Sequence, residues 1–521
     1  MRRSMTKQSF LRGTFILIIA GLITKLLGFI NRIVLARIIG AEGVGLYQFA
    51  IPTFILTVTL TRLGLPVAIS KLVAEAEAEG DRYKTKQVLI VSLSITFVLS
   101  IVWTTGLFQL APVLAKHFFT DERTVYPLLA IAPVLPIVAI SSVLRGYFQG
   151  KQDMRPSAYS QVIEQLVRIA LVWLLTTALL PYGIEYAAAG AMISVVFGEF
   201  ASLLYLLLSF KLNKPFKLRS DVLHLLKSGR KTFRDLMRIS LPTTGSQLIG
   251  SFSYFLEPIL VAQSLAIAGV LPHLATEQYG ALSGYAITLL LLPSFITYAI
   301  STSLVPAISE ASVQRHFRTI DYRLNQAIRL SLISGGISLT ISYNFAYPLM
   351  DLLYNAPEYA RYVQVMAPFF FFHYFQGPLA AALQALDFAR AAMINSLIGA
   401  IVKTAAIFAL ASNPSLGIMG VALAIALGIV LVTMLHFATL VRAVSFKLNI
   451  RDFIKGLAVM AISIIPASMF YKALVDPDRL FESTLMAIVL TSISYLILAL
   501  AIGALKKEDL KPIPVIGKWF K

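Results

Sequence analysis

The chain contains no cysteine and little charge for its length. Without cysteine it has no disulfides, no thiolate metal sites and no cysteine nucleophiles, and redox chemistry says nothing about its compartment. Asp, Glu, Lys and Arg make up 14% of the 521 residues, whereas 57% are hydrophobic, and the mean hydropathy is +0.77. This composition is far more apolar than that of a soluble globular protein. The sequence therefore predicts a multispanning membrane protein.

Motifs for nucleotide-driven transport and metal catalysis are also missing. The chain has no GxxxxGKS/T or HExxH motif, no long polar segment for a nucleotide-binding domain, and no metal-ligand spacing among its six histidines. We therefore expect no catalytic residues, no metal and no cofactor. An integral membrane transferase stays an alternative because such enzymes use few polar residues, although no clustered acidic pair is present to hold a metal-bound substrate.

Long apolar runs recur along the whole chain and predict an all-α membrane protein with fourteen transmembrane helices. The predicted spans are 10–39, 44–70, 87–115, 125–148, 157–180, 186–210, 236–268, 281–305, 326–350, 363–386, 392–412, 417–441, 453–475 and 483–505. Because their number is even, both termini are expected on the same side of the membrane.

The basic residues indicate which side that is. Loops on the side of the termini hold 34 of the 45 Lys and Arg residues, against five in the loops of the opposite face. Since cytoplasmic loops carry an excess of Lys and Arg, we expect both termini in the cytoplasm of a multi-pass cell-membrane protein. The net charge of +19 is then a feature of topology, and we expect no nucleic-acid partner.

A basic segment divides the predicted spans into two similar sets. Across it the sequence repeats weakly at an offset of 239: Leu65, Ala68, Ile69, Ser70, Tyr83 and Gln87 match Leu304, Ala307, Ile308, Ser309, Tyr322 and Gln326. Such a repeat predicts two six-helix bundles related by a pseudo-two-fold axis along the membrane normal. The predicted parts are an N-terminal bundle (1–210), a cytoplasmic linker (211–235), a C-terminal bundle (236–441), and two extra helices with a basic tail (442–521).

The first span carries a cationic stripe. Gly21, Lys25, Gly28 and Arg32 are spaced four, three and four residues apart, so a helix places them on one face, and Arg62 follows in the second span. A charge at the bilayer centre costs about 2.5–3.5 kcal/mol on insertion scales, so these side chains should face protein or water rather than lipid. Two interpretations stay open: a cationic cavity wall that binds an anionic substrate, or anchors that snorkel to the interfaces.

Other charges lie in later spans. Glu257, followed by Pro258, is an acid at a point where a helix can bend, and we expect it to couple transport to a cation or to be a structural acid. Glu164 and Arg168 are one turn apart and either neutralise each other or take part in gating. Lys403 in the eleventh predicted span has no acidic residue one helical turn away in the sequence, and we expect it to bind substrate.

Three stretches resemble a known superfamily. They are TKLLGFINRIVLARIIGAEGVGLYQFAIPTF, LTRLGLPVAISKLVAEAEAEGD and SYFLEPILVAQSL. With the fourteen-span plan, they are similar to the multidrug/oligosaccharidyl-lipid/polysaccharide exporter superfamily. The similarity is greatest to its spore-cortex branch from endospore-forming bacteria and more distant to MurJ-type lipid II flippases. The resemblance implies a V-shaped pair of bundles that moves a lipid-linked peptidoglycan precursor across the cytoplasmic membrane by alternating access.

The resemblance also implies a cavity lined by cations, with departures in this chain. Lys25 lies where MurJ-type proteins have a cavity arginine, Asn31 where they have a second arginine, and Arg32 where they have an aspartate. Arg62 lies beyond their second-span arginine. We expect a lipid-linked oligosaccharide and the bilayer as partners, with peptidoglycan synthases as further candidates, and membrane potential, H⁺ or Na⁺ as the driving force. A cation-coupled exporter of another polysaccharide lipid or drug, and a non-transporting scaffold for cortex synthesis, stay alternatives.

Overall fold

The computed structural model describes residues 7–212, 225, 228–444, 446–506 and 509. Within these ranges the chain is helical and contains no strand, as the composition predicts. Its contacts divide it into two compact units, Met1–Gly280 and Ala281–Lys521. Each unit is built from long apolar helices that lie side by side.

The first unit contains nine of the α-helices in the described residues. They are α1 (Lys7–Arg62), α2 (Leu65–Glu79), α3 (Arg82–Val113), α4 (Val125–Ile131), α5 (Val134–Gly150), α6 (Arg155–Leu179), α7 (Ile184–Leu212), α9 (Arg230–Ile267) and α10 (Pro272–Tyr279). A π-helical turn, Leu114–Phe118, extends α3.

Two breaks shape the first two helices. α1 leaves helical geometry at Gly40, where φ is 64° and ψ is −175°, so one assigned helix contains the first predicted span and most of the second. A second break separates α1 from α2 at Leu63 and Gly64, which have φ values of 46° and 61°. Glycine tolerates this left-handed region, whereas leucine does so only when its surroundings enforce it.

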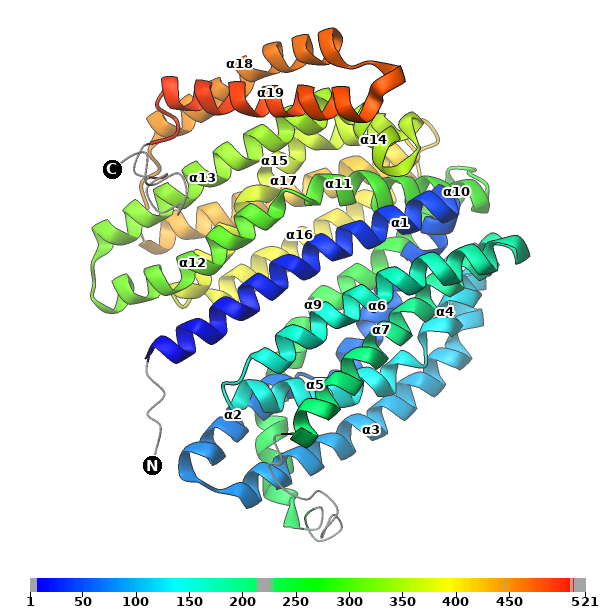
Figure 1. Ribbon diagram of the computed structural model, residues 1–521, viewed down its shortest axis with the longest axis vertical. Coiled ribbons are helices and arrows are strands. Elements are labelled where there is room, and N and C mark those ends of the chain that lie inside the picture. The colour runs from blue at the N-terminus through cyan, green and yellow to red at the C-terminus, as the bar shows by residue number, and fades with distance from the viewer. Residues whose placement is uncertain (1–6, 213–224, 226–227, 445, 507–508, 510–521) are drawn as a thin grey trace. The chain divides into compact units, whose positions relative to one another are not determined.

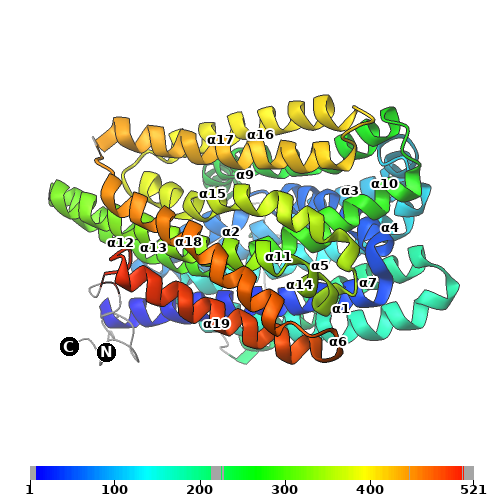
Figure 2. The same cartoon turned by 90° about the horizontal axis from the view of Figure 1, so that it is seen from above.

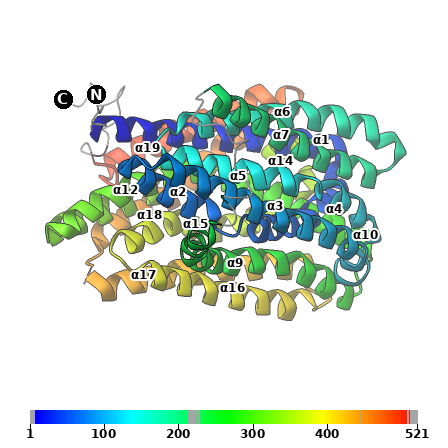
Figure 3. The same cartoon turned by 90° about the horizontal axis from the view of Figure 1, so that it is seen from below.

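One core cluster of the first unit lies around α2. Buried side chains of α2, α3 and α5 pack with those of α7 and α9 in one cluster that includes Leu65, Val88, Val143, Leu206 and Leu236. Figure 3 shows α2, α3 and α5 running side by side, and their mutual packing agrees. α9 packs against α1, α2 and α3 and therefore belongs to this unit.

The second unit contains the remaining α-helices of the described residues. They are α11 (Ile287–Leu291), α12 (Ser294–Val313), α13 (Phe317–Asn344), α14 (Ala346–Tyr354), α15 (Ala360–Ala385), α16 (Ala389–Ala411), α17 (Ile418–Val444), α18 (Ile450–Leu474) and α19 (Leu480–Ala501). α16 and α17 lie side by side, as do α18 and α19 (Figure 2).

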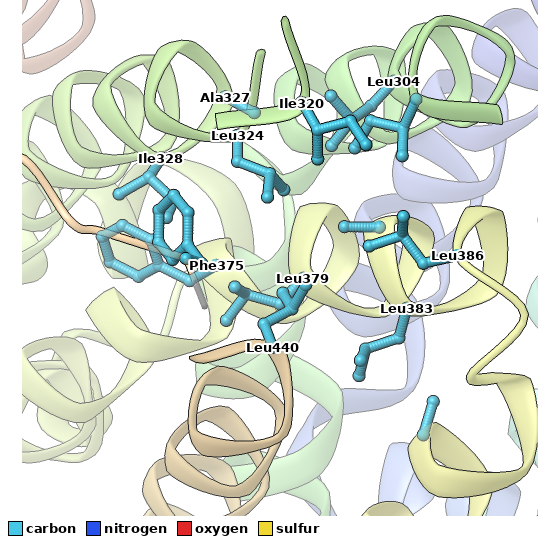
Figure 4. Packing of buried hydrophobic residues seen from close by; sticks show 14 of the residues in the cluster. Leu304, Ile320, Leu324, Ala327, Ile328, Phe375, Leu379, Leu383, Leu386 and Leu440 are labelled. Carbon is cyan, nitrogen blue, oxygen red and sulfur yellow. The ribbon is translucent and has the colours of Figure 1, made fainter. Parts of the chain in front are cut away.

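The main core of this unit joins α12, α13, α15 and α17. Leu304, Leu324, Leu383 and Leu440 come from these four helices, and Figure 4 shows them converging with their neighbours. This packing leaves an apolar cavity of about 230 Å³ between α13, α15, α17 and α18, lined by Ile328, Phe371, Phe372, Phe375, Leu379, Thr433, Met434, Phe437, Leu448 and Phe453.

A buried ion cluster ties the segment after α19 to the bundle. Arg329 of α13 donates from Nε and Nη2 to the carboxylate of Asp509 at 2.8 and 2.7 Å, and from Nη1 to Asp452 of α18 at 3.3 Å. Lys506 contacts the same Asp452 oxygen at 2.7 Å. Each charge has an opposite partner, so the cluster holds the two C-terminal helices against α13, beside which they run in Figure 1.

Most residues of each predicted span are helical, although several spans, such as 125–148 and 326–350, cross a break between two helices. By length and apolar composition, nine helices of the described residues can cross a membrane, or up to eleven if two bent helix pairs each count as one span. The chain is thus an all-helical, multi-pass membrane protein. The number fourteen, the two-fold relation and the side on which the termini lie stay predictions. So do the domain boundaries, including the linker 211–235, which lies largely outside the described residues.

Candidate functional site

Both cations of the stripe on α1, Lys25 and Arg32, are exposed, whereas the neighbouring Asn31 is buried with 6% of its surface accessible. The Asn31 side-chain oxygen accepts no hydrogen bond from any described residue. At Gly28, one turn before Arg32, an added Cβ would lie 4.0 Å from Oε1 of Gln165, so this part of α1 packs against α6. A substrate-binding role for these three residues stays a prediction.

The predicted coupling acid lies close to this stripe. Glu257 is buried in α9 beside Pro258, and α9 packs along α1, where Thr59 and Ser251 share a hydrogen bond of 2.9 Å. Glu257 and Arg32 both act electrostatically on the hydroxyl of Tyr254. The acid and one predicted substrate-binding cation therefore both lie within electrostatic range of Tyr254, although Glu257 is 225 residues beyond Arg32 in the sequence.

The predicted Glu164–Arg168 pair is part of a larger cluster. Arg168 Nη2 donates to Glu164 Oε1 at 2.6 Å, one turn along α6. Arg145 of α5 contacts the other oxygen of Glu164 at 3.3 Å, contacts Glu199 of α7 at 3.4 Å, and donates to the hydroxyl of Ser202 at 2.8 Å. One arginine therefore bridges two buried carboxylates.

Arg62 completes this five-residue charge cluster, which comprises Arg62, Arg145, Glu164, Arg168 and Glu199. Its Nη2 lies 3.9 Å from Glu199 Oε1, at the limit of an ion pair, and 34% of its side chain is exposed. Arg62 is the last residue of α1, directly before the break at Leu63 and Gly64. The cluster thus joins the end of α1 to α5, α6 and α7.

Close helix packing holds the cluster together. α6 and α7 lie side by side in Figure 1, and at Gly198 of α7 an added Cβ would lie 2.9 Å from the Glu164 carbonyl oxygen and 3.3 Å from Arg168 Cβ. Glycine therefore lets the two helices approach closely enough for Glu164 and Glu199 to share Arg145.

Two members of the cluster were not among the predicted site residues. They are Arg145 and Glu199, the second of which lies in the predicted span 186–210. In the structure, Arg145 is inside α5, and its side chain is 15% exposed. A buried acid in the sixth span needs a partner, and that requirement was the signal that could have pointed to a nearby arginine.

Lys403 lines a mostly apolar pocket of the second unit. The pocket, about 280 Å³, is lined by Ile287, Leu291, Phe370, His373, Gln376, Ser396, Gly399, Ala400, Lys403, Ile425, Gly428, Ile429 and Val432. The stem of Lys403 covers Gly428, where an added Cβ would lie 3.0 Å from Lys403 Cβ. Lys403, His373, Gln376 and Ser396 are the polar residues of this lining, a set that suits an anionic or sugar-like group.

Metal binding has no support in the described part of the chain, where no three His, Cys, Asp or Glu side chains lie close enough to hold an ion. The charged sites described above are dominated by arginine and lysine. What the arrangement offers chemically is therefore recognition of anions, with Glu257 as a nearby acid.

Known proteins are similar to this chain in sequence. The family model "Polysaccharide biosynthesis protein" matches residues 10–312, and the MatE model matches residues 254–408. Stage V sporulation protein B of Bacillus subtilis (strain 168) is 56% identical over 514 residues, 99% of each chain. Lipid II flippase MurJ of the same organism is 26% identical over 422 residues, which cover 75% of this chain and 76% of that one.

The solved structures agree with the sequence relatives. The inward closed conformation of lipid II flippase MurJ superposes with a TM-score of 0.71 at 16% identity, covering 92% of this chain and 97% of the other. At that identity the likeness establishes the fold. With the family model matching more than half of its residues, the chain belongs to the polysaccharide biosynthesis protein family and is a relative of stage V sporulation protein B.

Proposed function

We propose that this protein is a flippase that moves a lipid-linked peptidoglycan precursor of the lipid II type across the cytoplasmic membrane by alternating access. The observation that carries the proposal is the fold it shares over 92% of its length with a lipid II flippase. The 56% identical relative is named for sporulation, which supports a role in spore cortex synthesis.

The cations of the chain suit such a cargo. A lipid-linked disaccharide-peptide carries a pyrophosphate and carboxylates, which need charge-assisted hydrogen bonds in a site of low dielectric constant. Lys25, Arg32 and Arg62 are exposed or partly exposed cations in or at the end of one helix of the first unit, and Lys403 lines a pocket in the second. We assign these four side chains to the head group, while the polyprenyl tail stays in lipid.

Glu257 is the proposed coupling residue. A buried carboxylate must be neutralised by a cation, and both Arg32 and an entering H⁺ or Na⁺ can do this. When the anionic cargo takes Arg32, Glu257 is released to bind the coupling ion, which links the two events. Membrane potential or an ion gradient then drives the cycle, because the sequence has no motif for nucleotide hydrolysis.

Binding of purified lipid II to the full-length protein tests the proposed cargo, with undecaprenyl phosphate as the control. We expect saturable binding of lipid II that is much tighter than the binding of undecaprenyl phosphate, because undecaprenyl phosphate lacks the pyrophosphate, the sugars and the peptide. Equal binding of the two lipids would overturn it.

Export of drugs is a second candidate, favoured by the MatE match over residues 254–408. A cationic drug needs acidic and aromatic groups in its site, and the exposed cations of α1 argue against it. A lipophilic cation competing with lipid II for binding would support this second function. A scaffold for peptidoglycan synthases, in contrast, would tolerate neutralisation of all four proposed head-group cations without loss of cortex synthesis.

A further inference from the structure

The five-residue charge cluster of the first unit carries more positive than negative charge. Arg62, Arg145 and Arg168 face Glu164 and Glu199, so three guanidinium groups meet two carboxylates and one positive charge is in surplus. A buried cation without a full counter-charge is costly, which makes the location of this surplus informative.

The contacts assign the surplus to Arg62. Arg168 makes the shortest contact, 2.6 Å to Glu164, and Arg145 reaches both carboxylates at 3.3 and 3.4 Å. Arg62 has a single contact at 3.9 Å, and its side chain is 34% exposed, compared with 15% for Arg145 and 18% for Arg168. The Nε–H groups of all three arginines are buried and donate to no described residue, so Arg62 differs from the other two by its single long contact and its greater exposure.

The position of Arg145 determines which arginine carries the surplus positive charge. Arg145 is the residue whose guanidinium touches both glutamates, and Ser202 fixes it further through a 2.8 Å hydrogen bond. Without its charge, Glu199 would face the low-dielectric interior with Arg62 as its nearest cation. Because an unpaired buried carboxylate is strongly unfavourable, Glu199 would draw Arg62 inward into a tight pair.

We infer that Arg145 is a positioning residue that neutralises Glu164 and Glu199 and thereby keeps Arg62 available for an anionic group of the cargo, its diphosphate in particular. This inference rests on the proposed function for the identity of the cargo. The availability of Arg62 is a property of the protein alone and is measured without any cargo.

The rate at which phenylglyoxal modifies Arg62 measures this availability, because the reagent attacks guanidinium groups that are accessible and unpaired. The full-length protein in detergent is treated, and Arg62 is followed by peptide mass spectrometry. We expect Arg145→Gln to slow modification of Arg62 by about tenfold, as for a guanidinium drawn into a buried ion pair. The double variant Arg145→Gln with Glu199→Gln should restore the wild-type rate, because the competing carboxylate is gone.

A purely structural role for Arg145 predicts a different pattern. If Arg145 served only to hold α5 against α6 and α7, the second substitution would loosen the packing further and would restore nothing. An unchanged Arg62 rate in Arg145→Gln, or a rate that stays low in the double variant, overturns the inference. Should Arg145→Gln fail to fold, Glu199→Gln alone keeps all three arginines, and it must raise the Arg62 rate above wild type for the inference to stand.

Lipid II binding to the same variants provides the second readout. Arg145→Gln should weaken binding, and the double variant should recover it, although neither substituted residue is proposed to touch the cargo. Absence of lipid II binding to the wild-type protein would refute the proposed function but leave the phenylglyoxal pattern as an independent test. If Arg145→Gln weakens lipid II binding and the double variant does not restore it, the inference about Arg145 is refuted, but lipid II remains the proposed cargo.

Discussion

Arg32 has two proposed roles, binding of the anionic cargo and neutralisation of Glu257. It is exposed on α1, and both Arg32 and Glu257 act electrostatically on Tyr254. If it holds phosphate by charge, the sign of the side chain matters most and the fork geometry of arginine matters second. We therefore predict that Arg32→Lys keeps partial transport, whereas Arg32→Ala and Arg32→Glu lose it.

Each Arg32 variant is expressed in a sporulating strain from which the gene for the corresponding protein is deleted, and restored spore formation is measured. The abundance of the variant in the membrane is the control for folding. Equal function of all three variants at normal abundance would leave Arg32 with a structural role.

The spacing of four, three and four residues pointed to Arg32, because the positions that share one face of a helix can be worked out from the sequence alone. Arg145 was missed because its importance comes from contacts with α6 and α7 that the sequence does not display.

Gly198 is the close-contact glycine of the charge cluster. An added methyl group would lie 2.9 Å from the Glu164 carbonyl oxygen, which neither helix can avoid without moving. We predict that Gly198→Ala destabilises the protein by about 1–3 kcal/mol, as is usual for overpacking. Gly106 in α3 is the matched control, since an added Cβ there has nothing within 4 Å.

Thermal unfolding of the two alanine variants in detergent provides the comparison. Gly106→Ala should be neutral or should raise the melting temperature, because alanine is the better helix former by about 1 kcal/mol. Similar melting temperatures for both variants would mean that α6 and α7 do not need the glycine for their approach.

The segment before α4 is fixed by a buried carboxylate. Asp121 accepts hydrogen bonds from the backbone and the guanidinium of Arg123 at 2.9–3.1 Å and from the Thr276 hydroxyl of α10 at 2.8 Å. Burial alone would raise the pKa of Asp121, but the bonds from Arg123 and Thr276 outweigh it and hold the pKa below its usual value.

A lowered pKa makes this contact a source of pH-dependent stability. The stabilisation is complete above the unfolded-state pKa of about 3.9 and is lost as the pH falls through the lower pKa of the folded state. We predict that Asp121→Asn lowers stability by about 1–3 kcal/mol near neutral pH, and by less in acid, where wild-type Asp121 is itself protonated.

Melting temperatures of wild type and Asp121→Asn, measured from about pH 3 to about pH 7, test this expectation. Asp478→Asn is the control, since Asp478 is exposed and its carboxylate accepts no hydrogen bond within the described part of the chain, its backbone N–H donating to Asp476 instead. A difference between wild type and Asp121→Asn that stays constant over the whole range would contradict the assignment.

The long helices and their order could be predicted from the sequence, because apolar runs and loop charges are local features. The packing of α9 could not, because its contacts are with α1, α2 and α3, which are distant from it in the sequence. Similarly, Arg329 of α13 is buried between Asp452 and Asp509, which lie more than a hundred residues further along the chain. Both outcomes depend on packing between segments that are distant in the sequence.

Orientation in the membrane is a property of the whole chain, and the lack of native cysteine makes it easy to measure. Single cysteines at Ser228 and Asp478, both exposed, report on two loops of very different charge. We predict that an impermeant maleimide added to intact cells labels Asp478→Cys and not Ser228→Cys, because the basic segment at 211–235 stays in the cytoplasm. Labelling of Ser228→Cys from outside would reverse the predicted orientation.

Movement of lipid II between bilayer leaflets by the purified protein tests the central claim most directly. Proteoliposomes containing fluorescent lipid II are treated with an impermeant quencher, and the rate at which inner-leaflet lipid becomes quenched is compared with that in liposomes carrying Arg32→Ala and in protein-free liposomes. The account predicts that wild-type protein accelerates exposure of lipid II but not of a labelled phospholipid, and that Arg32→Ala removes the acceleration. No acceleration over protein-free liposomes, or equal acceleration for the phospholipid, would contradict it.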